Sequence, residues 1–341
     1  MKSSTDSFVL TIAIPTFDRN QHLERCVGIL LPQLRPGVQL VICDNASPNP
    51  VSESLAALLA SGADGRVQVI RNRCNIGGNA NILRCLEECQ TEWVWVLGDD
   101  DEPLPNAVDQ ILQDIETADE SLVSVNYKCE LFDRERALDL EGTEAFLRDM
   151  DSLSNVLFLS TSIFRAPALV QHLRLAYSYS YSLMPHVIAL AFALGNHGKV
   201  TLAMNRIVSW HQGEFGQMWS VVNAALAFPT LLDVPPLHRY RQVLARKMEQ
   251  DVHPEILGLA RQLLMLACHE GDFAGARWTW GQIYYRRFAG TSWSFRRVVA
   301  RCLTLLFVFP RLSHLVVERL ARLVLGRRAT VNTIQDRVTR I

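Results

Sequence analysis

Three consecutive carboxylates, Asp99, Asp100 and Asp101, are the residues of this chain best suited to chemistry. They directly follow residues 93–97, an apolar run that predicts a buried strand, so we expect them at the edge of a sheet. Adjacent carboxylates repel one another, and a divalent cation relieves that repulsion. Oxygen ligands suit Mg²⁺ or Mn²⁺, which bind substrate phosphates through only one or two protein carboxylates. A solvated acidic turn is the alternative for such a cluster, and its surroundings decide between the two.

Those surroundings alternate regularly between apolar runs and helical patterns. Strands are predicted at residues 9–14, 38–43, 67–70 and 93–97, with helices at 20–34, 52–59 and 78–88 between them. This alternation predicts a parallel sheet covered by helices on both faces, in which ligands bind beyond the carboxyl ends of the strands. Polar residues follow all four strands and converge on one edge: Thr16, Asp18, Arg19, Asp44, Asn45, Arg71, Asn72 and the three aspartates.

The later part of the chain divides near residue 218. We predict a strand at 122–127, a charged surface excursion at 130–151, strands at 156–164 and 200–208, and a helix at 186–194. From residue 221 onward the pattern is helical and punctuated by prolines. We therefore expect a catalytic domain at residues 1–217 and an α-helical domain at 218–341.

Four motifs in order and spacing carry a family resemblance. They are IAIPTFDR at residues 12–19, VICDNAS at 41–47, NIGGN at 75–79 and VWVLGDDD at 94–101. Residues 8–215 resemble the family 2 glycosyltransferases of GT-A fold, and within them bacterial O-antigen and surface-polysaccharide transferases, the abequosyltransferase-like group. The resemblance implies an α/β fold with a mixed, mainly parallel sheet, and sugar transfer from a nucleoside-diphosphate sugar to a saccharide hydroxyl.

The resemblance also implies a donor-nucleotide site made of residues that follow the strands. Phe17 would pack on the base, and Asp44 would accept a hydrogen bond from the base or ribose. Arg71 would lie near the base or diphosphate, with a surface arginine as an equal alternative. For the NIGGN motif, a purely structural turn is as consistent with the sequence as contact with the ligand. The implied donor-binding residues are Pro15, Thr16, Phe17, Arg19, Asp44, Asn45, Arg71, Asn75, Gly77 and Asp99.

For the metal, Mn²⁺ or Mg²⁺, the resemblance places a proline shortly after the last acidic position of the motif. Counting back from Pro105 makes Asp100 the principal ligand and Asp99 its neighbour on the ribose side, with Asp101 as a further metal or catalytic carboxylate. Gly98 then stands where the family usually has its first aspartate, and Asp99 with Asp101 also reads as a DxD. The resemblance adds His211 as a further metal ligand or diphosphate contact, with a surface histidine as the alternative.

The catalytic base departs from the family pattern. Inverting members carry an acidic residue at the start of the helix before the last strand, where this chain has His186. A neutral imidazole is a competent base, because its ordinary pKa is near working pH. A packed or capping histidine is the alternative, and Glu214, Asp151 or substrate-assisted chemistry remain open as other sources of the base.

Charge and hydropathy limit which classes of partner this chain can bind. The net charge is −1, which argues against nucleic acid, whereas residues 277–328 hold eleven arginines, no lysine and one acidic residue. Leucines and phenylalanines alternate with these arginines, which is typical of a helix on a membrane surface and would suit a polyprenyl-diphosphate-linked glycan acceptor. Packing on the catalytic domain or on a second copy of the chain is the alternative.

The location follows from what the sequence lacks. No run of 18 apolar residues or signal peptide is evident, and no cysteine pair has CxxC spacing. We therefore expect a cytoplasmic enzyme, peripheral on the inner face of the cytoplasmic membrane. A non-catalytic protein that binds sugar nucleotides is a second hypothesis, supported by the missing acidic base. A nucleotidyltransferase ranks lower, because residues 14–19 contain no glycine.

Overall fold

The computed structural model describes residues 8–60, 65–129, 134–151, 153–209, 227–251, 271–288 and 295–309, with shorter stretches between 260 and 268 and between 311 and 319. Its contacts divide the chain into two compact units, residues 1–211 and 212–341. The first unit contains the predicted sheet, and the second, where it is described, is helical.

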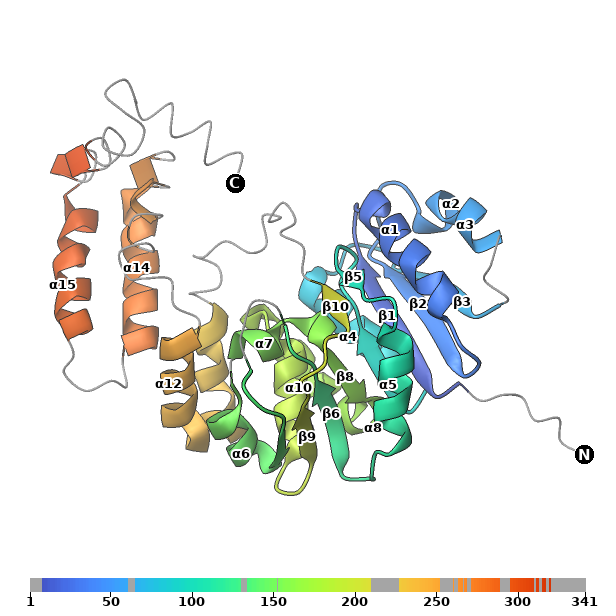
Figure 1. The fold of residues 1–341 in the computed structure, drawn as a ribbon. Helices are drawn as coiled ribbons and strands as arrows, with labels where there is room; N and C mark the ends of the chain where they lie inside the picture. The colour runs from blue at the N-terminus through green and yellow to red at the C-terminus, as the bar shows by residue number, and fades with distance from the viewer. Residues whose placement is uncertain are drawn as a thin grey trace, which may run out of the picture. The chain divides into compact units, whose positions relative to one another are not determined.

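An eight-stranded mixed sheet forms the centre of the first unit (Figure 1). Across the sheet the strands are β3 (Val67–Arg71), β2 (Val38–Asp44), β1 (Leu10–Thr16), β4 (Trp93–Val96), β8 (Ser162–Arg165), β6 (Leu122–Asn126), β9 (Lys199–Leu202) and β7 (Leu138–Glu141). The first four strands pair in parallel, whereas β8 and β7 are antiparallel to their neighbours. This confirms the predicted mixed, mainly parallel sheet. A separate ribbon joins β5 (Glu102–Pro103) to β10 (Val208–Ser209).

Alternate residues of the strands face two helical layers. Leu10, Ile12 and Ile14 of β1 share one apolar core with helices α1 (Asn20–Leu30), α2 (Val51–Ser54) and α5 (Ala107–Glu116). Helix α4 (Gly78–Glu87) contacts the same strands but lies outside that core, so it covers the other face, together with α8 (Ala166–Val170), α9 (Leu173–Ser178) and α10 (Pro185–Leu194). The remaining elements of this unit are α3 (Ala56–Ala60), α6 (Gly142–Asp149), α7 (Leu153–Leu157), η1 (Leu31–Gln33), η2 (Leu159–Thr161) and η3 (Ser180–Ser182).

The predictions for two segments near the site were wrong. Residues 134–151 are an ordered part of the fold, with β7, α6 and a buried Arg134, because hydrogen bonds satisfy the charge of that arginine. Residues 156–164 are not one strand: α7 and η2 precede β8, which begins only at Ser162. The backbone turns at residues 159–161, where the hydroxyl of Ser160 donates to Asp101 and that of Thr161 donates to the carbonyl of Asn155.

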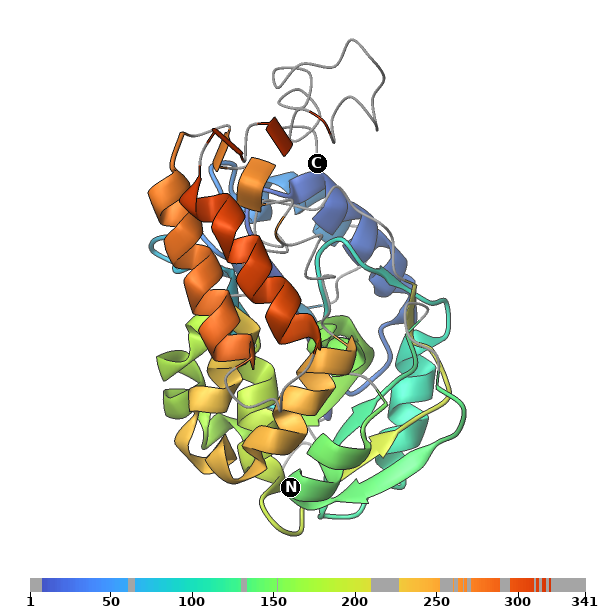
Figure 2. The same ribbon diagram turned by 90° about the vertical axis from the view of Figure 1, so that its left-hand side faces the viewer.

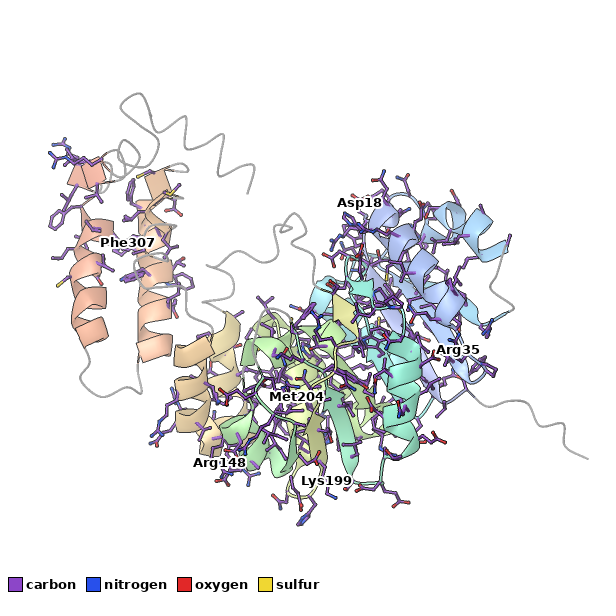
Figure 3. All side chains as sticks on the ribbon, viewed as in Figure 1. Asp18, Arg35, Arg148, Lys199, Met204 and Phe307 are labelled. Atoms are coloured by element: carbon purple, nitrogen blue, oxygen red, sulfur yellow. The ribbon has the colours of Figure 1, made fainter. Side chains whose placement is uncertain are left out.

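The second unit contains a helical pair with its own small core. Helices α14 (Phe273–Phe288) and α15 (Phe295–Val308) run side by side in both views (Figures 1 and 2). Phe307 points into the space between them, where its ring stacks on Trp280 with the centroids 5.3 Å apart (Figure 3). The indole of Trp280 also donates a hydrogen bond to Thr304 Oγ1 at 3.0 Å. The other elements described are η5 (Phe228–Asp233), η6 (Pro235–Tyr240) and α12 (Arg241–Asp251).

Candidate active site

The ends of four parallel strands bring the predicted polar residues into one row. The register of the sheet aligns Thr16 with Asp44 and Asp44 with Arg71. On the other side of β1, Ala13 aligns with Val96, so the residues that follow β4 reach the level of Thr16. The hydroxyl of Thr16 donates a hydrogen bond to Asp99 Oδ2 at 2.7 Å. The convergence predicted from the sequence is therefore a real contact between the ends of β1 and β4.

Asp44 anchors one side of this row. Its side chain is buried, and Oδ1 accepts a hydrogen bond from the backbone N–H of Ser47 at 2.8 Å. Its Oδ2 pairs with the guanidinium of Arg71, which also donates to the carbonyl of Ser47 at 2.8 Å. Asp44 thus holds both the loop after β2 and the side chain of Arg71. Contact between Asp44 and a nucleotide stays a prediction.

Four asparagines fix the loops beside Asp44. Asn45 donates to Asn75 Oδ1 at 2.8 Å and accepts from Asn72 at 3.0 Å. Asn72 also donates to Asn81 at 2.9 Å, and Asn81 donates to the carbonyl of Cys43 at 2.8 Å. These bonds give Asn75 a structural function in the turn. Asn81 was not among the predicted residues, although four asparagines between residues 72 and 81 were a visible signal.

Glycine is needed at the start of the turn into α4. Gly77 has φ +87°, in the left-handed region that side chains disfavour, and its N–H donates to Asn75 Oδ1 at 2.8 Å. Two residues other than glycine, Asp18 (φ 55°) and Ala46 (φ 64°), adopt the same region in the loops after β1 and β2. Such conformations cost about 1–3 kcal/mol each and cluster at functional sites. Their position next to the row of strand ends marks these loops as a built site.

Phe17 and Pro15 lie at the end of β1, beside this row of strand ends. Phe17 is 39% exposed, and Pro15 is half-buried in the last residues of the strand. The loop that carries Phe17 is tied down, because the N–H of Asp18 donates to Ser47 Oγ at 3.0 Å. An exposed aromatic ring on a fixed loop provides a surface on which a base can stack.

The three aspartates have three different environments. Asp99 is buried and accepts from Thr16, and Arg19 Nη1 lies 3.1 Å from its Oδ1. Asp100 is the most exposed of the three side chains, at 35%, and its Oδ2 lies 2.6 Å from Arg19 Nη2. Asp101 is buried and turned toward Ser160, whose hydroxyl donates to Oδ2 at 2.5 Å. Asp100 is thus the carboxylate that an incoming cation can reach.

Burial makes two of these carboxylates hard to ionise. Burial raises the pKa of Asp99 to about 6, against the opposing effects of Arg19 and Thr16. Burial also raises the pKa of Asp101 to about 7, although the hydroxyl of Ser160 lowers it. The charges of the neighbouring aspartates raise both pKa values further. The positive charge of Arg19 lowers both pKa values but offsets the effect of burial only in part.

A steric constraint explains why residue 98 is a glycine. A Cβ atom at this position would lie 2.5 Å from Asp101 Oδ2, closer than any real contact. The N–H of Gly98 donates to Ser160 Oγ at 2.8 Å, and Ser160 in turn donates to Asp101. Glycine at this departure from the family pattern allows the third carboxylate to fold back against the strand end.

His186 lies where the sequence placed it, at the first turn of α10, but inside the protein. Its imidazole is only 2% exposed, and Nε2 lies 3.3 Å from the carbonyl of Val156. Burial lowers the pKa of His186 to about 4. The histidine is therefore neutral and a weak proton acceptor in this state. Its burial supports a packing function, and the role as catalytic base stays a prediction.

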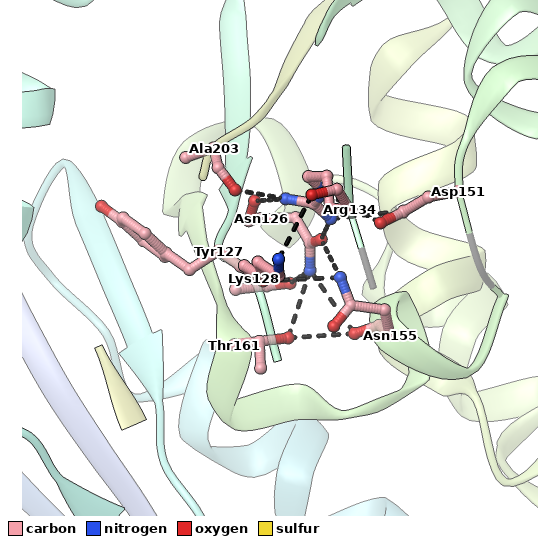
Figure 4. A network of polar contacts seen from close by, with 9 residues as sticks. Asn126, Tyr127, Lys128, Arg134, Asp151, Asn155, Thr161 and Ala203 are labelled. Carbon is pink, nitrogen blue, oxygen red and sulfur yellow. Dashed lines mark hydrogen bonds and ion pairs between the residues drawn. The ribbon is translucent and has the colours of Figure 1, made fainter. Parts of the chain in front are cut away.

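A buried polar network lies at the same edge of the sheet (Figure 4). Arg134 donates to the carbonyls of Asn126 and Ala203 at 2.7 and 2.6 Å, and its Nε donates to Asp151 at 2.8 Å. Asn126 in turn donates to Thr161 Oγ1 at 3.2 Å, next to the Ser160 that holds Asp101. Asp151, an alternative base, is thus engaged by Arg134. Arg134 was not among the predicted residues, since nothing in the neighbouring sequence distinguishes it from a surface arginine.

Two predicted residues fall outside the described part of the chain, His211 and the alternative base Glu214. Within the described part, no group of three or more histidine, cysteine, aspartate or glutamate side chains is arranged to hold a metal ion. At the strand ends two carboxylates, Asp99 and Asp100, lie close enough for the guanidinium of Arg19 to contact both. This number fits Mg²⁺ or Mn²⁺, which complete their coordination with substrate phosphates and water.

Comparisons with known proteins agree with this geometry. The family described as glycosyl transferase family 2 matches residues 11–162. Glycosyltransferase GlyG of Streptococcus pneumoniae serotype 4 is 23% identical over 122 residues, which are 36% of this chain. The match spans only 40% of that relative's length.

Solved structures extend the likeness to the whole fold. The structure of S. aureus TarS 1–349 in complex with UDP-GlcNAc has a TM-score of 0.57 at 13% identity, over 90% of this chain and 88% of that chain. Its complex with UDP gives a TM-score of 0.52 at 11% identity, over 90% of both chains. The family match supports the predicted family over residues 11–162, and the solved structures confirm the predicted GT-A fold.

Proposed function

We propose that this chain transfers a sugar from a nucleoside-diphosphate sugar to a saccharide hydroxyl, on the premise of its GT-A fold and of the match of residues 11–162 to glycosyl transferase family 2. The observation that carries this proposal is the row of Thr16, Asp44, Arg71 and Asp99 at four strand ends, with Asp100 open beside it. Open α/β sheets bind their ligands at such an edge. The complexes of TarS with UDP-GlcNAc and UDP support a donor of this class.

We assign the donor nucleotide to the loops after β1, β2 and β3. Phe17 offers the base an exposed ring, and Arg71, held by Asp44, offers a positioned positive charge to the base or the diphosphate. Asn45, Asn75 and Gly77 keep the surrounding turns in place. We therefore propose that Phe17 and Arg71 contact the donor nucleotide, whereas most of the other implied donor-binding residues hold the surrounding loops in place.

We assign the divalent cation, Mn²⁺ or Mg²⁺, to Asp100 with Asp99 beside it. When bound, such a cation neutralises the negative charge that develops on the departing diphosphate. Asp101 supports the pair from behind, because Ser160 orients it and Gly98 leaves room for it. His211, just beyond the described residues, is our candidate for a further ligand.

His186 is our candidate for the base, acting once the acceptor saccharide has opened access to it. A His186→Ala variant that transfers sugar at the full rate would remove this assignment. Phe164, whose ring centroid lies 6.4 Å from that of His186, supplies a matched control, because Phe164→Leu disturbs the same packing without removing a proton acceptor. Loss of transfer in His186→Ala but not in Phe164→Leu supports a chemical role.

The acceptor proposal rests on the second unit. Apolar side chains are exposed at the end of α15 and beyond it: Leu305, Val308, Phe309, Leu312 and Leu315. Exposed Arg311 and Arg319 lie among them, in a segment with eleven arginines and one acidic residue. Exposed apolar groups beside an excess of positive charge fit an anionic membrane surface, where a polyprenyl-diphosphate-linked glycan would be found. Among the described residues, no helix is both long and apolar enough to cross a membrane.

Sedimentation with vesicles tests the membrane proposal. We expect the protein to bind vesicles that contain phosphatidylglycerol and not vesicles of phosphatidylcholine alone, and Leu305→Glu with Phe309→Glu to abolish binding. Val170→Glu is the matched control, since Val170 is an exposed apolar residue of α8. Equal binding by the double variant, or self-association of the chain in place of vesicle binding, would contradict the proposal.

A thermal-shift screen of nucleotide sugars, with and without Mn²⁺, tests the main proposal. A ligand that binds only the folded state stabilises it, by about 2.7 kcal/mol at a hundredfold excess over its Kd. We expect one donor to raise the melting temperature in the presence of Mn²⁺, and Asp100→Asn to lose this effect. Asp109→Asn, in the exposed pair with Arg35, is the matched control. Full stabilisation of Asp100→Asn would overturn the metal assignment, and a protein that no nucleotide sugar stabilises would overturn the function.

A further inference from the structure

Arg19 bridges two of the three aspartates at the site. It lies at the N-cap position of α1, and its two terminal nitrogens separate onto different carboxylates. Nη1 lies 3.1 Å from Asp99 Oδ1, and Nη2 lies 2.6 Å from Asp100 Oδ2. One guanidinium therefore supplies the positive charge that two adjacent carboxylates need when they stand without a cation.

The ion pair with Arg19 occupies Oδ2 of Asp100, the carboxylate to which we assign the cation. Asp100 is 35% exposed and Arg19 37%, whereas Asp99 is 6% exposed. A divalent ion approaching Asp100 from solvent meets both the positive charge of Arg19 and an oxygen already engaged by it. The guanidinium and the ion therefore compete for Asp100.

The attachments of Arg19 differ from those of the other arginines at this edge. Arg71 is held by the buried Asp44 and by the carbonyl of Ser47, and the buried Arg134 donates to carbonyls of two segments. Arg19 is 37% exposed, close to the 40% of Arg71, but one of its two attachments is to a carboxylate that is itself open to solvent. Its side chain can leave Asp100 without breaking a hydrogen bond to the backbone of another segment, since both bridging contacts are to side chains.

We propose that Arg19 is a placeholder for the divalent cation: it closes the Asp99–Asp100 pair while the site is empty and releases Asp100 when the cation enters with the donor. The released guanidinium then faces the phosphates that the cation brings. This inference rests on the proposed function, because it takes Asp100 as a cation ligand. It makes Arg19 a positioning residue whose removal strengthens the binding of the cation alone.

If the ion pairs of Arg19 were permanent and purely structural, removing Arg19 would have the opposite effect on cation binding. If Arg19 served only to hold the carboxylates in their positions, its loss would disorder Asp99 and Asp100 and weaken cation binding. The sign of the change in Mn²⁺ affinity therefore separates the two roles, and it does so without any measurement of sugar transfer.

Mn²⁺ affinity can be measured directly by electron paramagnetic resonance of the free ion, with no nucleotide present. We expect Arg19→Gln to bind Mn²⁺ about two- to fivefold more tightly than the unaltered protein, the range for loss of a partly exposed competing ion pair. Arg35→Gln, which removes the exposed pair with Asp109, is the matched control and should leave the affinity unchanged. Equal or weaker Mn²⁺ binding by Arg19→Gln would overturn the inference.

A second variant and a second probe complete the test. Arg19→Lys keeps the charge but lacks the two terminal nitrogens that each contact one carboxylate. Its Mn²⁺ affinity should therefore fall between those of the other two proteins, and it decides the question if the glutamine variant does not fold. With Mn²⁺ present, inorganic pyrophosphate should bind Arg19→Gln more weakly, because the released guanidinium is missing. If pyrophosphate binds both proteins equally, the second half of the inference fails.

The proposed function has its own control in the same measurement. Asp100→Asn should lose Mn²⁺ binding whatever Arg19 does. If Asp100→Asn binds Mn²⁺ like the unaltered protein, the metal assignment fails, whereas unchanged binding in Arg19→Gln alone removes only the placeholder role.

Discussion

The hydroxyl of Ser160 donates a hydrogen bond of 2.5 Å to Asp101, and this contact joins the two halves of the sheet at the site. Asp101 follows β4 of the parallel half, whereas Ser160 precedes the antiparallel strand β8. The N–H of Gly98 completes the link by donating to Ser160 Oγ at 2.8 Å. The loop that carries the aspartates is therefore fixed from both sides, by Thr16 and by Ser160.

Replacing Ser160 with alanine should destabilise the protein. The buried Asp101 would lose its hydroxyl partner, a loss worth about 1–3 kcal/mol of unfolding free energy. Urea denaturation near pH 8 measures it, with Ser178→Ala as the control, because the hydroxyl of Ser178 makes an exposed bond to the carbonyl of Arg174. Equal midpoints for the two variants would contradict the role of Ser160.

Gly98→Ala tests the steric argument. The added methyl group would overlap Asp101 Oδ2, so we expect a loss of about 1–3 kcal/mol in stability, together with weaker Mn²⁺ binding. Gly28→Ala in α1 is the matched control, since nothing lies within 4 Å of the new methyl group. In a helix interior that change should be neutral or stabilising, by up to about 1 kcal/mol. If both glycine variants behave alike, the crowding at Gly98 is not what matters.

Arg134→Met should cost far more than the loss of a surface arginine. It leaves Asp151, whose side chain is only 16% exposed, without its ion pair and removes the donors to Asn126 and Ala203. Breaking a buried pair by removing one partner costs about 3–5 kcal/mol. Arg148→Met, which removes an exposed pair with Asp149, should change stability by no more than about 1 kcal/mol. Calorimetric melting compares the two, and similar shifts would show that the network is not a structural centre.

His186 should make the protein sensitive to acid. Burial lowers its pKa to about 4, so the unfolded chain takes up the proton first and stability is lost as the pH falls from the ordinary histidine value through 4. Between about pH 7 and about pH 4.5, the unaltered protein should lose on the order of 2 kcal/mol more than His186→Gln. His197→Gln, at a largely exposed position, should lose as much as the unaltered protein. The pH dependence of urea denaturation measures all three, and identical losses would contradict the burial of a neutral imidazole.

Much of the fold could be predicted because its signals are local. Apolar runs such as residues 9–14 and 93–97 became β1 and β4, since a strand buried on both faces must be apolar throughout. The residues that follow these strands, Thr16 and Asp99, had to meet once the strands were parallel neighbours. Where the signal was weaker, at residues 130–151, a pattern of charges indicated a surface loop, and the prediction failed because Arg134 finds its acceptors in other segments.

The sequence by itself therefore determined the sheet edge and the chemical types gathered on it: carboxylates, an arginine, an exposed aromatic residue and a glycine turn. Only the tertiary structure decided how these groups are used. It turned Asp101 toward Ser160, left Asp100 open under Arg19, and enclosed His186 beneath Val156 and Phe164. Periodicity and spacing act along the chain, whereas burial, ion pairing and pKa depend on neighbours that are distant in sequence and meet only in the folded protein.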